Sequence, residues 1–144
     1  MMVVNRIFPE IYLPAEEIDF FQHMVYPLVL NPGECFIELN TRCDRIAYVD
    51  SGVLCKVIIH EQKPHILSRY VKDDFVTQFS GFIGGENSRT AIRALEPTRL
   101  TIISDLLFHQ LCQRHVCWIQ FWLKVFGTEI SDLIEQEKYF HGPD

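Results

Sequence analysis

Short runs of β-branched and aromatic residues alternate with clusters of turn residues between positions 25 and 104. Such runs, bounded by glycine, proline, asparagine and aspartate, are typical of β-strands joined by tight turns. The predicted strands are Val25–Leu30, Cys35–Leu39, Arg45–Val49, Val53–His60, His65–Val71, Thr90–Leu95 and Arg99–Ile103. A glycine-containing loop is predicted over Phe79–Asn87. Strands that recur at a spacing of about ten residues favour an antiparallel sandwich or barrel.

A short helical pattern precedes the strands, within residues 1–24. Apolar residues recur there at intervals of three, behind a proline that suits a first helical turn and two acidic residues that suit the positive end of a helix. The residues concerned are Pro14, Glu16, Glu17, Ile18, Phe21 and Met24.

Two helices are predicted after the strands, within residues 105–140. Ser104 can cap a first helix over Asp105–Arg114, and a second helix runs from about Val116 to Tyr139. An apolar stripe follows one face of the second helix, and it must be covered either by the strands or by another subunit. Its members are Ile119, Trp122, Phe126, Ile130 and Leu133.

The composition indicates a single globular domain over residues 1–144. Hydrophobic residues make up 48% of the 144 positions and aromatic residues 12%, which is enough for one buried core. The formal net charge of −6 argues against direct DNA binding, since nucleic-acid-binding surfaces are basic. The sequence has no apolar run of membrane-spanning length and no signal-peptide core, so we expect no membrane attachment.

The cysteines indicate a reducing environment. They number five, at irregular spacing and without a Cys-x-x-Cys pair. An odd, scattered set of this kind predicts free thiols and a cytoplasmic protein rather than a disulfide framework.

Neither catalysis nor metal binding is predicted. The sequence has no nucleophile elbow, no Gly-x-x-x-x-Gly-Lys-Ser/Thr loop and no His-Glu-x-x-His motif. No two of the six histidines have the spacing of a metal site on one element, although His60 and His65 could face each other across a hairpin. We therefore expect neither an enzyme nor a bound metal.

Four segments resemble motifs of one known family in their order and spacing. Asn31–Glu34 resembles the family's first glycine turn, and Tyr48–Val53 resembles its Ser-Gly hairpin. Lys72–Val76 resembles its Gly-Asp segment, and Ser88–Leu95 resembles the end of its phosphate-binding cassette with the strand beyond it. Over residues 13–139 the chain thus resembles the effector domain of the Crp/Fnr (catabolite-activator-like) family. The resemblance implies an antiparallel, jelly-roll-like β-roll with flanking helices and a long C-terminal helix, the cyclic-nucleotide-binding fold.

The cassette of this chain departs from the family pattern. Members that bind cyclic nucleotides have a cassette that begins Phe-Gly-Glu and ends Arg-Ser/Thr-Ala. Here Thr77 stands in place of the glycine and Gln78 in place of the ribose-binding glutamate. Arg89 matches the closing arginine by the residues that follow it, whereas counting back from the next strand puts Ser88 in the arginine's place. Both registers stay open at this point.

The resemblance implies a ligand pocket in the roll for a cyclic nucleotide or another small anion. Loss of the charged partner of a buried phosphate costs about 2–5 kcal/mol, so tight binding of a cyclic nucleotide is not expected. The resemblance also implies a homodimer that pairs through the apolar stripe of the C-terminal helix. The candidate ligand-binding residues are Phe75, Thr77, Gln78, Gly84, Gly85, Ser88, Arg89 and Thr90.

Two functions of different class follow from these expectations. The first is an intracellular small-molecule sensor, in which a ligand in the roll shifts the long helix and with it the dimer partner. The second is a structural module, in which the pocket has decayed and the roll supports a dimerising helix. Family regulators continue from the long helix into a helix-turn-helix domain. Because this sequence ends at Asp144, we expect a stand-alone module.

Overall fold

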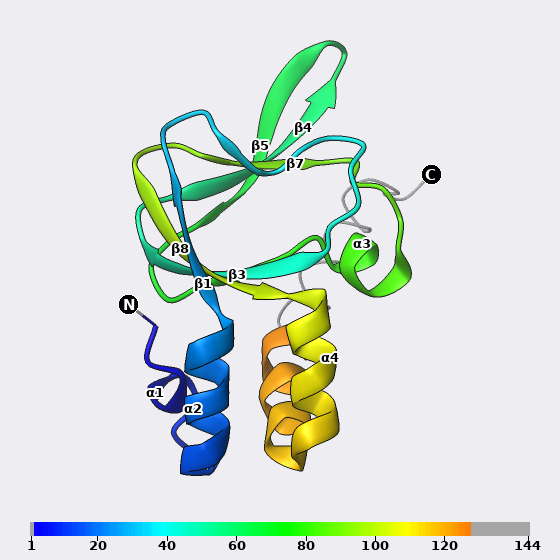
Figure 1. The fold of residues 1–144 in the computed structure, drawn as a ribbon. Coiled ribbons are helices and arrows are strands. Elements are labelled where there is room, and N and C mark those ends of the chain that lie inside the picture. Colours follow the sequence, from blue (N-terminus) through cyan, green and yellow to red (C-terminus); the bar gives the residue numbers. More distant parts are fainter. Residues whose placement is uncertain (1, 128–144) are drawn as a thin grey trace.

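Two four-stranded antiparallel sheets form a β-roll, which occupies the upper part of Figure 1. The computed structural model describes residues 2–127. One sheet has the order β1-β8-β3-β6, formed by Tyr26–Leu30, Thr98–Ser104, Arg45–Ser51 and Phe75–Val76. The other has the order β2-β7-β4-β5, formed by Cys35–Ile37, Ala91–Ala94, Leu54–His60 and Lys63–Tyr70. The predicted mainly-β roll with flanking helices is confirmed.

The predicted strands are confirmed with ends that differ by one or two residues, but β6 and the helix that follows it were not predicted. Strand β6 has only two residues, too few for an alternating pattern. The predicted loop Phe79–Asn87 is wrong in its first part, because Phe79–Gly84 form helix α3. A Cβ on Gly81 in this helix would lie 2.8 Å from the carbonyl oxygen of Glu86. Glycine has a low helix propensity, but at position 81 it allows α3 to pack closely against the Glu86 backbone. A sequence pattern does not show close packing of this kind.

The helices lie together below the roll in Figure 1. They comprise α1 (Val4–Ile7), α2 (Ala15–Met24), α4 (Asp105–Arg114) and a helical stretch over residues 116–127. The predicted cap of α4 is confirmed, since the hydroxyl of Ser104 accepts a hydrogen bond from the Leu107 N–H at 3.1 Å. The predicted continuation of the last helix to Tyr139 lies outside the described residues. Within residues 2–127, no helix is both long and apolar enough to cross a membrane.

The Ser-Gly hairpin between β3 and β4 requires its glycine. Gly52 has a φ of +94°, and a Cβ there would lie 2.4 Å from the hydroxyl oxygen of Thr98 and 2.5 Å from the carbonyl oxygen of Pro97. The buried Thr98 hydroxyl accepts a hydrogen bond from the Val53 N–H at 3.2 Å. The hairpin therefore packs directly on the turn between β7 and β8, which explains the match to the family motif at this point.

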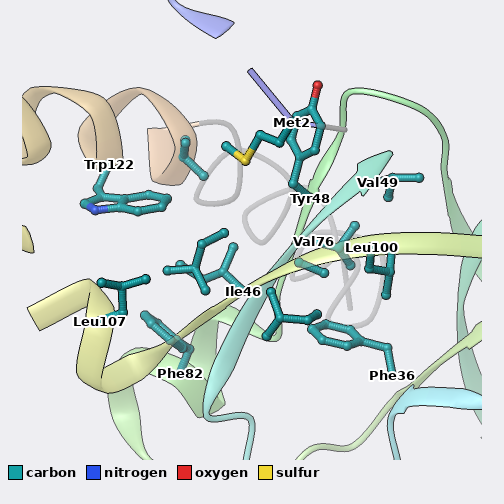
Figure 2. Close-up of a cluster of buried hydrophobic side chains, with 14 of the residues drawn as sticks. Met2, Phe36, Ile46, Tyr48, Val49, Val76, Phe82, Leu100, Leu107 and Trp122 are labelled. Atoms are coloured by element: carbon teal, nitrogen blue, oxygen red, sulfur yellow. The ribbon is translucent and has the colours of Figure 1, made fainter. Parts of the chain in front are cut away.

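One hydrophobic core joins the roll to the helices. Figure 2 shows side chains of both sheets, such as Phe36 and Leu100, in the same cluster as Phe82 of α3, Leu107 of α4 and Trp122 of the last helix. The helices therefore share buried surface with the roll, and the two parts form a single packed unit.

Candidate functional site

Strand β4 carries a buried lysine, Lys56, of which only 6% is exposed. In register, Lys56 lies opposite Ile92 of β7 and Ser68 of β5. Leu54 and Lys56 are two residues apart on one strand and therefore share a face, and Leu54 and Ile92 both belong to the hydrophobic core. Lys56 thus faces the interior of the roll. It is missing from the predicted site, although a single lysine within the apolar run Val53–His60 was a usable signal.

The residues that lead into β7 alternate between inside and outside. Ser88 and Thr90 are buried, at 1% and 6% exposure, whereas Arg89 between them is exposed. The Ser88 carbonyl accepts a hydrogen bond from the Asn40 N–H, and the Ser88 N–H donates one to the Thr41 carbonyl, both at 2.8 Å. These bonds fix the register that the sequence left open. Ser88 lies inside and Arg89 outside, so Arg89 does not face the interior of the roll.

The structure brings two of the predicted ligand-binding residues together. The Thr90 hydroxyl donates a hydrogen bond to the side-chain oxygen of Gln78 at 2.8 Å. This bond engages the amide oxygen and leaves the two amide N–H donors of Gln78 for another partner. The Ser88 hydroxyl is engaged locally, since it donates to the Thr90 carbonyl and accepts from the Thr90 N–H at 3.2 Å. We call Lys56, Gln78 and Thr90 the polar cluster of the roll.

Two other predicted ligand-binding residues make packing contacts. Thr77 is 1% exposed, and its hydroxyl donates to the carbonyl of Arg45 at 3.1 Å. The ring of Phe75 lies 5.8 Å from the ring of Phe121 and 6.1 Å from that of Trp122, measured between centroids. These contacts hold β6 against the sheet and against the last helix, directly before Gln78 of the polar cluster.

Gly84 and Gly85 form the exposed C-terminal end of α3. Gly85 has a φ of +76°, and its N–H donates to the Gly81 carbonyl at 3.0 Å, a left-handed helix cap. A Cβ on Gly84 or Gly85 would meet no atom within 4 Å. The backbone of both glycines is therefore open. The other side of α3 packs on α4, where the rings of Phe82 and Phe108 are 5.2 Å apart.

A single carboxylate ties three helices together. Glu17 of α2 is 7% exposed and accepts two hydrogen bonds of 3.0 Å from the guanidinium of Arg114, the last residue of α4. The indole N–H of Trp118, in the 116–127 helix, donates to the same carboxylate at 3.0 Å. The Arg114 guanidinium also lies 3.8 Å from the ring centroid of Phe20, a cation–π contact. We call Glu17, Arg114 and Trp118 the helix clasp.

The helix clasp lowers the pKa of the Glu17 carboxyl. The hydrogen bonds from Arg114 are the main cause; burial opposes them, and the Trp118 hydrogen bond and the charge of Arg114 add to the lowering. His115 lies between α4 and the next helix, and its ring nitrogen accepts from the Cys117 N–H at 3.0 Å. Glu17 is therefore ionised at neutral pH, and its charge is neutralised within the clasp.

The predicted apolar stripe of the last helix does not form one exposed face. Trp122 is 2% and Phe126 8% exposed, because both rings fill the protein's own core beside the roll. Ile130 and Leu133 of the stripe lie outside the described residues. An exposed apolar face does exist on this helix, and its members are Val116, Ile119 and Leu123, at 59%, 45% and 67% exposure. Of the two covers that the sequence allowed for the stripe, Trp122 and Phe126 therefore have the first, packing within the protein itself, and a dimer seam through these two rings is not supported.

A surface hollow of about 440 Å³ lies outside the predicted site, between β2 and the segment that leads into β3. Its lining includes Tyr26, Phe36 and Arg45, and none of the predicted ligand-binding residues. Arg45 is already engaged, since its guanidinium donates to the Phe36 carbonyl at 2.8 Å and lies 4.9 Å from the Phe36 ring centroid. A ligand in the hollow would therefore have to replace these contacts of Arg45 in order to use its charge.

The cysteine and histidine side chains of residues 2–127 do not gather into a metal site. Among the residues that the structure describes, no group of three or more histidine, cysteine, aspartate or glutamate side chains could hold a metal ion. His60 and His65 do face each other, with ring centroids 6.0 Å apart. All five cysteines are free, and burial raises the pKa of the Cys35, Cys112 and Cys117 thiols. A raised pKa keeps these thiols protonated and poorly nucleophilic.

Solved structures match the fold over most of the chain. A cyclic nucleotide-binding domain from Methylobacillus flagellatus KT superposes with a TM-score of 0.74 at 11% identity, covering 88% of this chain and 72% of that one. The Catabolite Activator Protein of Thermus thermophilus gives a TM-score of 0.72 at 12% identity, covering 90% and 61%. The sensor domain of the transcriptional regulator DNR from Pseudomonas aeruginosa gives 0.69 at 14% identity, covering 85% and 83%.

Comparison by sequence, unlike comparison by structure, finds no related protein. No protein-family model and no curated protein matches the chain. The chain spans 61% of the length of the Thermus protein. At identities of 11–14% the likeness establishes the fold: the chain has the fold of cyclic nucleotide-binding domains and Crp/Fnr regulators, as its sequence motifs predicted.

Proposed function

We propose that the roll is the ligand-binding part of a small-molecule sensor and that a bound ligand alters the position of the C-terminal helix. The observation that carries this proposal is the polar cluster inside a fold shared with cyclic nucleotide-binding and sensor domains. Burying a lysine and a hydroxyl in a roll lowers stability unless they are hydrogen-bonded, so such groups are commonly kept for binding.

A continuous set of contacts supports coupling between the roll and the helix. Gln78 lies between β6 and α3, the two elements that carry Phe75 and Phe82. The Phe75 ring packs on Trp122, and the Phe82 ring lies 6.0 Å from that of Phe126. A ligand that moves Gln78 would therefore change two contacts with the last helix, one made by Phe75 and the other by Phe82. Differential contact of this kind is what a signal requires.

Ligand titration is expected to change the tryptophan emission. The chain has two tryptophans, Trp118 and Trp122, and both belong to the 116–127 helix, so emission reports on that helix. Cyclic AMP, cyclic GMP and inorganic phosphate are the probes, and calorimetry on the same samples measures binding independently. We expect saturable heat with at least one probe and an emission change over the same concentration range. Heat without an emission change would contradict the coupling, and no heat with any probe would contradict ligand binding.

A second candidate function is a structural module with a decayed pocket. Arg89 on the outside of the roll and the local engagement of the Ser88 hydroxyl favour it, because both remove groups that would hold a phosphate. The same reasons lead us to expect weak binding of cyclic AMP. The titration separates the two functions, since a structural module would leave both heat and emission unchanged.

We further propose that two copies pair through the exposed face formed by Val116, Ile119 and Leu123. Three large apolar side chains in one row on a helix are costly to leave in water. The homodimer expected from the sequence thus uses this face in place of Trp122 and Phe126.

A Leu123→Glu variant is expected to sediment at half the mass of the wild-type protein. Leu123 is 67% exposed, so the charge disrupts the pairing face without entering the core. Analytical ultracentrifugation of both proteins measures the change. The matched control is Ile59→Glu on β4, an exposed apolar position in the β4–β5 hairpin, which should leave the mass unaltered. A wild-type protein that sediments as a monomer would exclude this dimer.

A further inference from the structure

We propose that Lys56 supplies the positive charge of an anion site inside the roll, so that the ligand is a small anion held from strand β4. This rests on the proposed function, and it adds the residue that recognises the charge of the ligand. Of the buried residues in the described part of the chain, Glu17 and Lys56 carry the charges. Glu17 belongs to the helix clasp, whereas Lys56 faces into the roll.

The arginines of the neighbouring strands lie on the opposite face. Arg93 of β7 and Arg69 of β5 both pair in register with Cys55, the residue next to Lys56. Adjacent residues of a strand point to opposite faces of the sheet. Arg93 and Arg69 therefore line the outer face, and Arg89 is also outside. Among these four basic residues, Lys56 brings its charge to the interior.

The register of the sheet places Thr90 near the lysine. Thr90 precedes Ile92, the in-register partner of Lys56, by two residues, which makes Thr90 its diagonal neighbour. Diagonal neighbours are separated by about 7–8 Å, a distance that long side chains can bridge. Thr90 holds the amide of Gln78 through the amide oxygen, so the Gln78 N–H groups are directed away from that bond. An ammonium group and amide N–H groups are both donors that suit an anion.

The energetic cost of the lysine supports a role in binding. An ammonium removed from water is costly even when it is paired, and an apolar residue of similar size would stabilise the core better. Lysine is also a compact point charge without the planar fork of arginine. It suits the single phosphate or carboxylate group of a small molecule and does not require the bidentate geometry of a guanidinium pair.

Substitution of Lys56 tests this inference with three probes: inorganic phosphate, cyclic AMP and the uncharged nucleoside adenosine. In Lys56→Met the affinity for the anionic probe that binds the wild-type protein should fall by about ten- to a hundredfold, the range for a hydrogen bond to a charged group. The control Arg89→Gln removes a charge from the outer face and should leave that affinity unchanged. Calorimetry gives the affinities, and thermal unfolding shows that each variant is folded. Lys56→Gln, which keeps a polar side chain, should show the same loss of binding.

The outcomes separate this inference from the proposed sensor. Loss of anion binding in both Lys56 variants, with retention in Arg89→Gln, supports it even if the tryptophan emission never changes. Equal affinity in Lys56→Met and wild type would overturn it, as would a wild-type protein that binds neither anion. Binding of adenosine that is indifferent to Lys56 would leave a ligand-binding sensor in place and would overturn the anion site alone.

Discussion

Replacement of Trp122 by alanine is expected to lower the free energy of unfolding by about 3–5 kcal/mol, the usual cost of removing a buried aromatic side chain. The side chain is 2% exposed and packs among the rings of Phe75, Phe108 and Phe121 at centroid distances of 6.1, 5.4 and 4.9 Å. Its loss leaves a cavity where the last helix meets the roll. Urea denaturation followed by circular dichroism measures the change.

Two further variants sharpen this measurement. Leu106→Ala, at a 64% exposed position of α4 outside the pairing face, should change the free energy of unfolding by no more than about 0.5 kcal/mol. Trp122→Phe keeps a ring and removes an indole nitrogen that is buried without an acceptor among the described residues, so it should cost much less than alanine. If Trp122→Ala were as stable as Leu106→Ala, the last helix would not be packed on the roll as described.

Replacement of Glu17 by leucine is expected to cost about 1–3 kcal/mol of unfolding free energy, because the fully buried indole N–H of Trp118 loses its acceptor. Arg114 adds little to this figure, since 37% of its side chain remains exposed and water can solvate it. The matched control is Glu16→Leu, an exposed glutamate of the same helical turn. Equal stability of the two variants would show that the clasp does not hold the helices.

The difference in unfolding free energy between the wild-type protein and Glu17→Leu is expected to depend on pH. The folded-state pKa of Glu17 is lowered relative to the unfolded chain, so its stabilising contribution is complete above the ordinary glutamate pKa of about 4.3. That contribution is lost as the pH falls through the lowered folded-state pKa. The difference in stability between the wild-type protein and Glu17→Leu should therefore be constant at neutral pH and shrink in acid. A difference that is unchanged in acid would contradict the role of the carboxylate charge.

Local patterns allowed the strands and the capped helix α4 to be predicted from the sequence. Hydrophobic alternation and turn residues act over a few positions, and the Ser104 cap is a contact of three residues' span. The helix clasp could not be predicted in this way. Arg114 and Trp118 reach Glu17 across 97 and 101 positions, and no local pattern records such contacts.

The candidate site was predicted in part, for a related reason. Gln78 and Thr90 come from segments that the family motifs located, and the structure joins them. Arg89 was a plausible anion ligand by its neighbours in the sequence, but a shift of one residue decides which face a side chain takes. The hydrogen bonds of Ser88 with residues 40 and 41 fix that shift. Lys56 lay within a strand that was predicted correctly, but its inward direction followed only from the register with β7.

The strand order also has a consequence for synthesis on the ribosome. Strand β8 lies between β1 and β3, and β7 lies between β2 and β4, so the last two strands within residues 2–127 are inner strands of the two sheets. A nascent chain that has emerged only as far as β6 has outer strands without their central partners, and its unpaired edges are open to association with other chains. Productive folding must therefore wait until Thr98–Ser104 has been translated and released from the exit tunnel. Long-range pairing of this kind is slow, which makes the nascent chain a natural client for chaperones.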